Sequence, residues 1–191
     1  MRSIGVFGGA FNPPHLGHQR LARYFADKLH FARIRVIPSF IPVHKSSADL
    51  ADAEDRLQMC RLLFEEDDRF EVSDMEIKRG GKSYTYDTLL QIGKELPDHQ
   101  IFLILGSDML NSFHTWYRYE DILKIATLCV ASREPGLLLD ENPFGAIVAD
   151  LPALEVSSTA IRQAVAAGED ITPFTGEKVA KYVKDRGLYL A

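Results

Sequence analysis

Short apolar runs alternate with stretches of helical periodicity through the first half of this sequence, and that order restricts the fold strongly. The apolar runs, each of the length of a buried strand, lie at 4–7, 33–38, 70–77 and 99–106. The stretches with apolar residues at helical spacing lie at 15–31, 53–64 and 85–96. Strands that alternate with helices are typical of a parallel sheet, because parallel strands need long crossover connections. We therefore predict an α/β fold.

The second half of the chain continues this pattern less regularly. It predicts helices at 119–126, 158–167 and 177–186, strands at 127–132 and 146–151, and a surface loop at 137–142. The 191 residues contain no internal repeat, low-complexity tract or linker. We therefore predict a single domain, 1–191, whose last helices form a small C-terminal helical portion.

Composition argues against several classes of protein. A net charge of −5 argues against general nucleic-acid binding, which needs a basic face to neutralise phosphates. Cys60 and Cys129 lie far apart within apolar stretches, so we expect two buried thiols rather than a disulfide framework or a zinc site. No apolar run approaches the ~20 residues of a membrane helix, and no signal-peptide core precedes Gly8. We expect a cytoplasmic protein with no membrane or nucleic-acid partner, and a homo-oligomer is compatible with the sequence.

The stretch GVFGGAFNPPHLGH, residues 5–18, joins the first predicted strand to the first predicted helix. Gly8 and Gly9 let the backbone approach a ligand closely, and the helix start offers N–H groups and a positive dipole end to an anion. His15 and His18 lie on one face of that helix, so both can point at one phosphate. A tight turn with two surface histidines is the structural alternative, but the complete pattern favours a phosphate site.

Two common nucleotide-binding motifs do not explain this stretch. GVFGG lacks the spacing of G-x-G-x-x-G, and the residues 80–83, GGKS, have Glu76 where a Walker loop has its first glycine. Residues 5–18 instead resemble the H-x-G-H signature of the nucleotidyltransferase superfamily, in the branch of nicotinate and nicotinamide mononucleotide adenylyltransferases. Other stretches similar to motifs of that branch are PSFIPVHK (38–45), EIKRGGKSYTYDTL (76–89), LILGSDMLNSFHTWYRYEDIL (103–123) and EVSSTAIR (155–162).

The resemblance implies a Rossmann-like doubly wound parallel sheet with helices on both faces. It also implies a nicotinate mononucleotide adenylyltransferase of NAD biosynthesis, in which the acceptor's 5′-phosphate attacks the α-phosphorus of ATP to give deamido-NAD and pyrophosphate. That phosphate is ionised at neutral pH, so catalysis is expected to depend on alignment and charge neutralisation rather than on a general base. Mg²⁺ is expected to accompany ATP, since the sequence shows no dedicated carboxylate cluster for a metal.

Three other functions stay open at this point. Nicotinamide mononucleotide is the alternative acceptor, although the SYT segment at 83–85 and the compact length favour nicotinate. Transfer to another phosphorylated acceptor, such as phosphopantetheine, or cytidylyl transfer is a second possibility. A non-catalytic nucleotide-binding paralogue is the third, because Ala10 replaces the family's usual threonine or serine and Glu134 interrupts the expected R-P-G after Arg133. Asn12 also stands where aspartate is more frequent.

The resemblance assigns the candidate site residues motif by motif. The predicted catalytic residues are His15, His18 and Arg162. The predicted ATP-binding residues are Gly8, Gly9, Phe11, His15, His18, Gly106, Asp108, Ser157, Ser158, Thr159 and Arg162. The predicted acceptor-binding residues are His44, Lys45, Tyr84, Thr85, Thr88, Asp108, Trp116, Tyr117 and Arg133. No residue is predicted to bind a metal directly.

Several of these assignments have a structural alternative. The hydroxyls at 157–159 and the following Arg162 can meet ATP phosphates, or can form an ordinary helix cap with a surface arginine. Lys45 can contact a phosphate or remain a solvated loop residue. Asp108 follows a buried strand and can accept from ribose hydroxyls or cap a helix. Trp116, the only tryptophan, can stack on a pyridinium ring or pack in the core.

Overall fold

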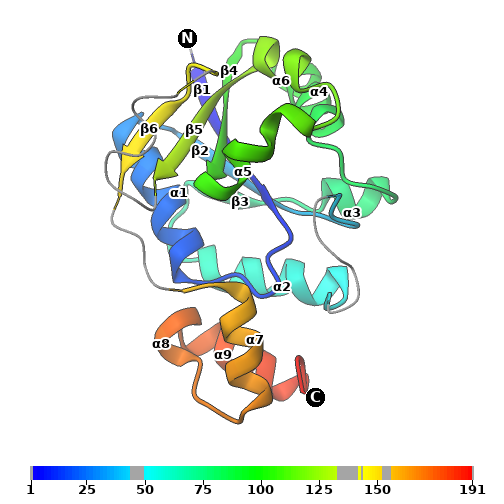
Figure 1. Cartoon of the computed structure of the whole chain (residues 1–191), viewed down its shortest axis with the longest axis vertical. Coiled ribbons are helices and arrows are strands. Elements are labelled where there is room, and N and C mark those ends of the chain that lie inside the picture. Colours follow the sequence, from blue (N-terminus) through cyan, green and yellow to red (C-terminus); the bar gives the residue numbers. More distant parts are fainter. Residues whose placement is uncertain (1, 44–49, 133–141, 143, 152–155, 191) are drawn as a thin grey trace.

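The computed structural model describes residues 2–43, 50–132, 142, 144–151 and 156–190. These residues form one sheet of six parallel strands in the order β3-β2-β1-β4-β5-β6 (Figure 1). The strands are β1 (Arg2–Gly9), β2 (Arg33–Pro38), β3 (Phe70–Val72), β4 (His99–Gly106), β5 (Ala126–Ser132) and β6 (Ile147–Asp150). Because β2 and β4 flank β1 on opposite sides, the strand order reverses there. Open α/β sheets bind ligands at such a point.

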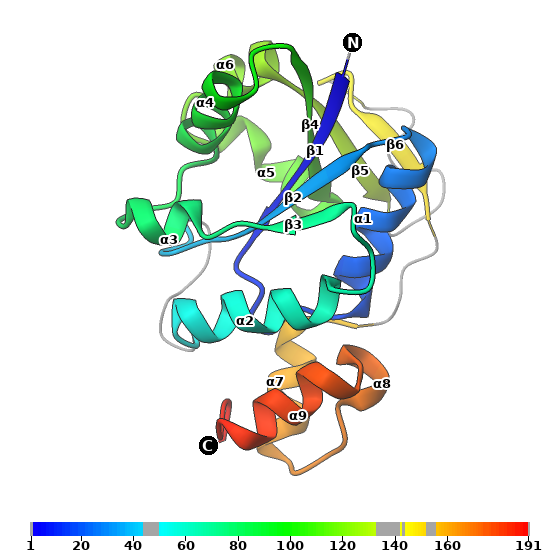
Figure 2. The same ribbon diagram turned by 180° about the vertical axis from the view of Figure 1, so that it is seen from behind.

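Helices cover both faces of the sheet (Figure 2). They are α1 (Leu16–Lys28), α2 (Ala53–Phe64), α3 (Met75–Arg79), α4 (Thr85–Glu95), α5 (Ser107–Ser112), the 3-10 turn η1 (Phe113–Thr115), α6 (Tyr119–Ile125), α7 (Ser158–Ala166), α8 (Thr172–Thr175) and α9 (Glu177–Asp185). The buried side chains of α1 and α2 belong to one hydrophobic cluster, and those of α4 and α6 belong to another. The predicted doubly wound α/β fold is therefore confirmed.

The strand β4 shows how one sequence serves both clusters. Phe102 and Ile104 pack with α1 and α2, whereas Ile101, Leu103 and Leu105 pack with α4 and α6. Successive side chains of a strand point to opposite faces, so a strand covered on both sides must be apolar throughout. This is why the run from 99 to 106 reads as continuous rather than alternating.

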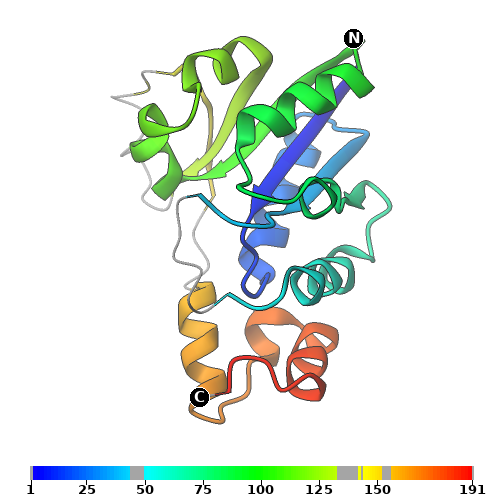
Figure 3. The same ribbon diagram turned by 90° about the vertical axis from the view of Figure 1, so that its right-hand side faces the viewer.

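The last three helices form the expected small C-terminal portion, located beside α2 at the end of the molecule to which β1 runs (Figure 3). Ile161, Val179 and Val183 are buried in the same cluster as the side chains of α1 and α2. The Asp55 carboxylate of α2 accepts hydrogen bonds from Tyr182 Oη at 2.8 Å and Arg186 Nε at 3.1 Å. The C-terminal portion therefore continues the main core. The assignment of a single domain stays a prediction.

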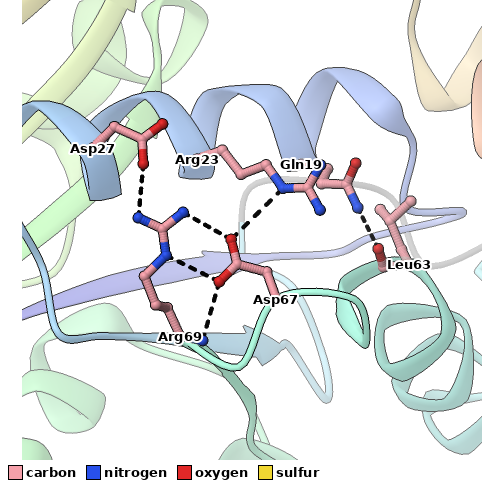
Figure 4. Close-up of polar contacts among 6 residues, drawn as sticks. All are labelled: Gln19, Arg23, Asp27, Leu63, Asp67 and Arg69. Carbon is pink, nitrogen blue, oxygen red and sulfur yellow. Dashed lines mark hydrogen bonds and ion pairs between the residues drawn. The ribbon is translucent and has the colours of Figure 1, made fainter.

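A polar network also joins α1 to the segment between α2 and β3 (Figure 4). Arg69 Nε and Nη2 donate to the two oxygens of Asp67 at 2.9 and 2.8 Å, and Arg69 Nη1 donates to Asp27 Oδ1 at 2.7 Å. Arg23 lies 3.8 Å from the same Asp67 carboxylate. These contacts hold the pKa of Asp67 below its usual value, chiefly through the hydrogen bond from Arg69.

The strand predicted at 70–77 is wrong in its second half. β3 ends at Val72, and α3 begins at Met75. Ser73 and Asp74 are residues that favour helix starts, and the Asp74 carbonyl accepts from Lys78 N at 2.8 Å. A helix also turns Met75 and Glu76 inward together, which a strand cannot do with neighbouring residues.

Other boundaries differ by smaller amounts. β1 is longer than the predicted 4–7, and the short elements α5, η1 and α8 were not predicted. The loop predicted at 137–142 lies outside the described residues except for Asn142. In the described part of the chain, every helix is too short or too polar to cross a membrane.

Candidate active site

The loop from β1 to α1 begins at the carboxyl end of a central strand. A side chain at Gly9 would come within 3.3 Å of the Phe11 ring, so the loop folds back closely on the strand end. Phe11 has a positive φ of 47° and is 2% exposed. Its ring lies edge-on to Phe7, with centroids 5.3 Å apart. Phe11, a predicted ATP-binding residue, is therefore buried within the loop, whereas Gly8 at the end of β1 is exposed.

The two predicted catalytic histidines lie together at the start of α1. Their rings stack with centroids 3.7 Å apart and an interplanar angle of 30°. The backbone N–H of His15 donates to Nδ1 of His18 at 3.1 Å, so this nitrogen carries no proton and the proton of the neutral ring lies on Nε2. Phe11 supports the His18 ring from the side, with centroids 5.1 Å apart. His18 is therefore fixed in both orientation and tautomer.

Gly17 gives the histidine pair the space that it needs. A Cβ atom at this position would lie 3.0 Å from His15 Nδ1 and 3.1 Å from Val156 Cγ1. The His15 ring therefore lies against the backbone of α1 at Gly17, and Val156, just before α7, approaches the same point. His15 is 8% exposed as a result.

The start of α7 meets the same loop although nearly 150 residues separate them. Ser158 Oγ donates to the Pro13 carbonyl at 2.8 Å, and Arg162 Nη1 donates to the Asn12 carbonyl at 3.0 Å. Ser157 caps the helix, because its Oγ accepts from Ala160 N at 3.1 Å. The structure thus brings the predicted residues of both motifs together.

The side chain of Asn12 connects this loop to two parts of the chain that are distant from it in sequence. Its Oδ1 accepts from Ala51 N at 3.0 Å and from Tyr189 Oη at 2.8 Å. Burial raises the pKa of Tyr189, so the phenol remains a hydrogen-bond donor at neutral pH. An asparagine oxygen suits this position because both neighbours are donors.

A second group of predicted residues lies around the start of α4 and in the segment between η1 and α6. Tyr84 directly precedes α4, whose first residue is Thr85, and its ring lies 4.9 Å from that of Tyr117. Tyr117 is 51% exposed, whereas Trp116 is 8% exposed and packs on Phe113 with centroids 5.3 Å apart. Core packing, the structural alternative for Trp116, is therefore observed, and stacking on a pyridine ring stays a prediction.

Thr88 is less accessible than its assignment suggested. It is 3% exposed, and its Oγ1 donates to Glu76 Oε1 at 2.5 Å and accepts from Arg79 Nη2 at 2.8 Å. Any effect of Thr88 on an acceptor would therefore pass through these neighbours.

Of the remaining predicted residues, some lie outside the described part of the chain and others lie at the ends of β4, α5 and α7. His44, Lys45 and Arg133 lie outside the described residues. Gly106 ends β4 beside β1, and Asp108 falls in the first turn of α5. Thr159 is exposed on the first turn of α7.

Comparison with known proteins identifies the family. The family model described as cytidylyltransferase-like matches residues 6–164. A probable nicotinate-nucleotide adenylyltransferase of Geobacillus thermodenitrificans (strain NG80-2) is 36% identical over 99% of this chain and 87% of that protein. The nicotinate-nucleotide adenylyltransferase of Bacillus subtilis (strain 168) is 34% identical over 99% of both chains. This chain belongs to the nicotinate-nucleotide adenylyltransferase family.

Solved structures of adenylyltransferases share the fold. A putative nicotinate-nucleotide adenylyltransferase from Vibrio parahaemolyticus aligns with a TM-score of 0.75 at 25% identity, covering 99% of this chain and 96% of that one. The nicotinic acid mononucleotide adenylyltransferase of Plasmodium falciparum, complexed with NaAD, aligns with a TM-score of 0.82 over 99% and 98% of the two chains. At 18% identity the latter likeness establishes the fold. The predicted family and nucleotidyltransferase class are confirmed.

Sequence reasoning missed several residues that shape this adenylyltransferase site. Gly17 lies inside the recognised motif but was given no role of its own. Tyr189 and Arg56 were not singled out at all, because a tyrosine near the chain end and an arginine in a first helical turn are both typical of solvent-exposed positions. Only their tertiary contacts connect them to the loop after β1.

Proposed function

We propose that this chain transfers AMP from ATP to nicotinate mononucleotide, giving deamido-NAD and pyrophosphate. The observation that carries the proposal is the meeting of two helix starts at the carboxyl end of β1. His15 and His18 lie at the start of α1. Ser158 and Arg162, in the first turns of α7, donate hydrogen bonds to the loop between β1 and α1. Two such helix starts with donor side chains are suited to a triphosphate.

We propose that His18 acts as a hydrogen-bond donor to the phosphates of ATP. Its Nδ1 is occupied by the backbone N–H of His15, so Nε2 carries the proton and faces away from that contact. A donor fixed in this way stabilises the charge that develops on the oxygen bridging the α- and β-phosphates. The attacking phosphate is already an anion, so the chain needs no general base.

Arg162 and the α7 start would hold the β- and γ-phosphates. The bond from Nη1 to the Asn12 carbonyl fixes the guanidinium plane, and its remaining N–H groups extend the donor set. Ser157, Ser158 and Thr159 would add hydroxyl and backbone donors at the helix start. Mg²⁺ would enter as Mg-ATP, because the described residues hold no group of three or more metal-ligating side chains.

The acceptor would lie toward α4, with Tyr84, Thr85 and Tyr117 as its described neighbours. The residue before Tyr84, Ser83, donates its backbone N–H to the Ile41 carbonyl in the loop after β2, and His44 and Lys45 follow Ile41 in the sequence. Trp116, Thr88, Asp108 and Arg133 remain proposed contributors on that side. A cytoplasmic location and assembly into a homo-oligomer likewise remain predictions.

The direct test is pyrophosphate release from Mg-ATP with nicotinate mononucleotide and nicotinamide mononucleotide in parallel. We expect a strong preference for the nicotinate form and a loss of roughly 100-fold or more in kcat for His18→Ala, because one preorganised donor is removed.

Two results would change the assignment. Equal rates with the two mononucleotides, or a preference for nicotinamide mononucleotide, would show that the proposed acceptor is wrong and leave the enzyme class intact. ATP binding without pyrophosphate release from either compound, or from phosphopantetheine, would instead favour a nucleotide-binding paralogue.

A further inference from the structure

Arg56 is a fully buried cation that contacts the loops around the candidate active site. It lies in the first turn of α2 with 0% of its surface exposed. Its guanidinium donates to four backbone carbonyls: Nε to Ala51 at 2.9 Å, Nη1 to Ala10 at 2.8 Å and to Ser39 at 2.7 Å, and Nη2 to Phe40 at 3.1 Å. One side chain therefore joins the loop after β1, the loop after β2 and the entry to α2.

The charge of Arg56 is unusual for so buried a position. None of the ion pairs found among the described residues includes it. Burial lowers its pKa, yet a guanidinium stays protonated at neutral pH. A buried charge is costly unless its donors are satisfied, and here carbonyl oxygens satisfy them.

Glu76 is a buried carboxyl group that is connected to the loop after β2 through Ser83. It is 6% exposed, and it accepts from Thr88 Oγ1 and from the hydroxyl of Ser83. Ser83 Oγ in turn accepts from the backbone N–H of Phe40 at 2.9 Å. The peptide unit between Ser39 and Phe40 is thus held at both ends: its carbonyl by Arg56, and its N–H, through Ser83, by Glu76.

This peptide unit lies where two segments that carry proposed substrate-acceptor residues meet: the loop after β2 and the segment before α4. Ser83 N also donates to the Ile41 carbonyl at 3.0 Å, so the loop after β2 and the segment before α4 run together. Beyond Ile41 the chain leads to His44 and Lys45, and beyond Ser83 it leads directly to Tyr84 and Thr85. Moving the Ser39–Phe40 peptide would move both segments.

We propose that Arg56 and Ser83 are positioning residues that act on the acceptor through the shared Ser39–Phe40 peptide. This inference rests on the proposed function. Arg56 also donates to the Ala10 carbonyl, so it positions the loop after β1, the proposed ATP-binding loop, relative to the loop after β2. Of these two loops, Ser83 contacts only the loop after β2 in the described part of the chain, so it acts on the proposed site of nicotinate mononucleotide alone.

The test is a double-mutant cycle with Arg56→Lys and Ser83→Ala, read as kcat and KM for each substrate. Lysine keeps the charge but cannot donate in four directions at once. We expect Arg56→Lys to lower kcat about tenfold or more, and Ser83→Ala to lower kcat/KM for nicotinate mononucleotide about tenfold with KM for ATP within about twofold. Because both residues act through one peptide, the double variant should lose little more than the worse single variant.

A matched control lies on the same helix. Arg61 has a side chain that is 45% exposed and pairs with Glu54 at 3.9 Å, so Arg61→Lys should leave kcat and both KM values unchanged. Unfolding midpoints for every variant separate loss of fold from loss of positioning. If Arg56→Lys fails to fold, Ser83→Ala still tests the acceptor-side effect.

The outcomes distinguish the two proposals. Full activity in both variants, or losses that multiply in the double variant, would overturn the shared-peptide inference while wild-type activity upholds the proposed function. An inactive wild-type protein that binds no acceptor would overturn both.

Discussion

Gly17 lies where a side chain would displace a predicted catalytic histidine. The motif H-x-G-H is commonly read for its histidines, but the glycine has its own physical role here. Its missing Cβ lets the His15 ring rest against the backbone of α1 and beside Val156. The stacking of His15 on His18, at 3.7 Å, depends on that approach.

Gly17→Ala should therefore damage catalysis more than stability. The new Cβ would lie 3.0 Å from His15 Nδ1, so the ring must shift by several tenths of an ångström. We expect kcat/KM to fall about 100-fold, as misplaced reacting groups do. The unfolding midpoint should change little, because alanine favours the helix by about 1 kcal/mol and offsets the strain.

Gly93→Ala is the matched control for this substitution. Gly93 is also helical, but a Cβ there would meet only Ile101 Cδ1, at 3.9 Å. We expect unchanged kinetics and a gain of up to about 1 kcal/mol in the free energy of unfolding. Equal kinetics in the two variants would show that Gly17 has no part in placing His15.

Among the elements, the docking of α1 on the segment between α2 and β3 has an electrostatic component that can be isolated. The Asp67 carboxylate accepts hydrogen bonds from Nε and Nη2 of Arg69 and lies near Arg23, as Figure 4 shows. The Asp67 side chain is only 16% exposed. The same helix α1 carries the candidate histidines at its other end, so this network holds the far end of a catalytic element.

Asp67→Asn should destabilise the fold at neutral pH and not in acid. The folded-state pKa of Asp67 is lowered, chiefly by the hydrogen bond from Arg69, so the ionised form contributes stability above the unfolded value near pH 4. That contribution is lost as pH falls through the folded pKa. We expect a difference of about 1 kcal/mol between wild type and variant at pH 7, closing near pH 2, in urea unfolding.

A difference that persisted in acid would assign the effect to packing rather than to charge. Asp170→Asn provides a comparison outside this network: hydrogen bonds from Thr172 also lower the pKa of Asp170, but in an exposed turn, so any difference there should be smaller and should likewise close in acid.

At the scale of the whole molecule, the C-terminal helices complete the active-site loop. Tyr189, near the chain end, donates to Asn12 in the loop after β1. Arg162 donates to the backbone carbonyl of the same Asn12, and Ser158 donates to the carbonyl of Pro13, the next residue of that loop. The site is therefore assembled from the two ends of the chain, with α2 between them.

Tyr189→Phe should weaken both the fold and the reaction. Removing the hydroxyl takes one donor away from Asn12 Oδ1, which still accepts from Ala51 N at 3.0 Å, and frees the loop to shift. We expect a loss of about 1 kcal/mol in the free energy of unfolding and a several-fold lower kcat.

Tyr24→Phe provides the comparison for Tyr189→Phe. The Tyr24 hydroxyl accepts from Lys28 Nζ at 3.2 Å on an exposed part of α1. We expect its removal to leave kcat unchanged and stability within about 0.5 kcal/mol. An equal effect of the two substitutions on kcat would contradict the role of Tyr189.

Local patterns in the sequence were sufficient to predict a parallel α/β sheet with most of its strands and longer helices, and the motif resemblance predicted the doubly wound arrangement and the family. Period-two and period-3.6 spacing depend on nearby residues, and the motif at 5–18 is contiguous. The error at 70–77 has the same origin. The apolar residues there fit a strand, whereas in the fold Glu76 is buried on α3 and accepts from Thr88 of α4, a contact that the local pattern does not show.

Tertiary structure decided which residues support the site. Arg56 and Tyr189 lie outside every motif quoted from the sequence, and Ser83 lies in the SYT segment without a predicted role of its own, since each acts through partners more than 10 positions away. Nothing in a single sequence specifies which carbonyls will face a buried guanidinium. That choice depends on how the sheet places the loops after β1 and β2 side by side, because hydrogen bonds depend on position in space rather than on separation along the chain.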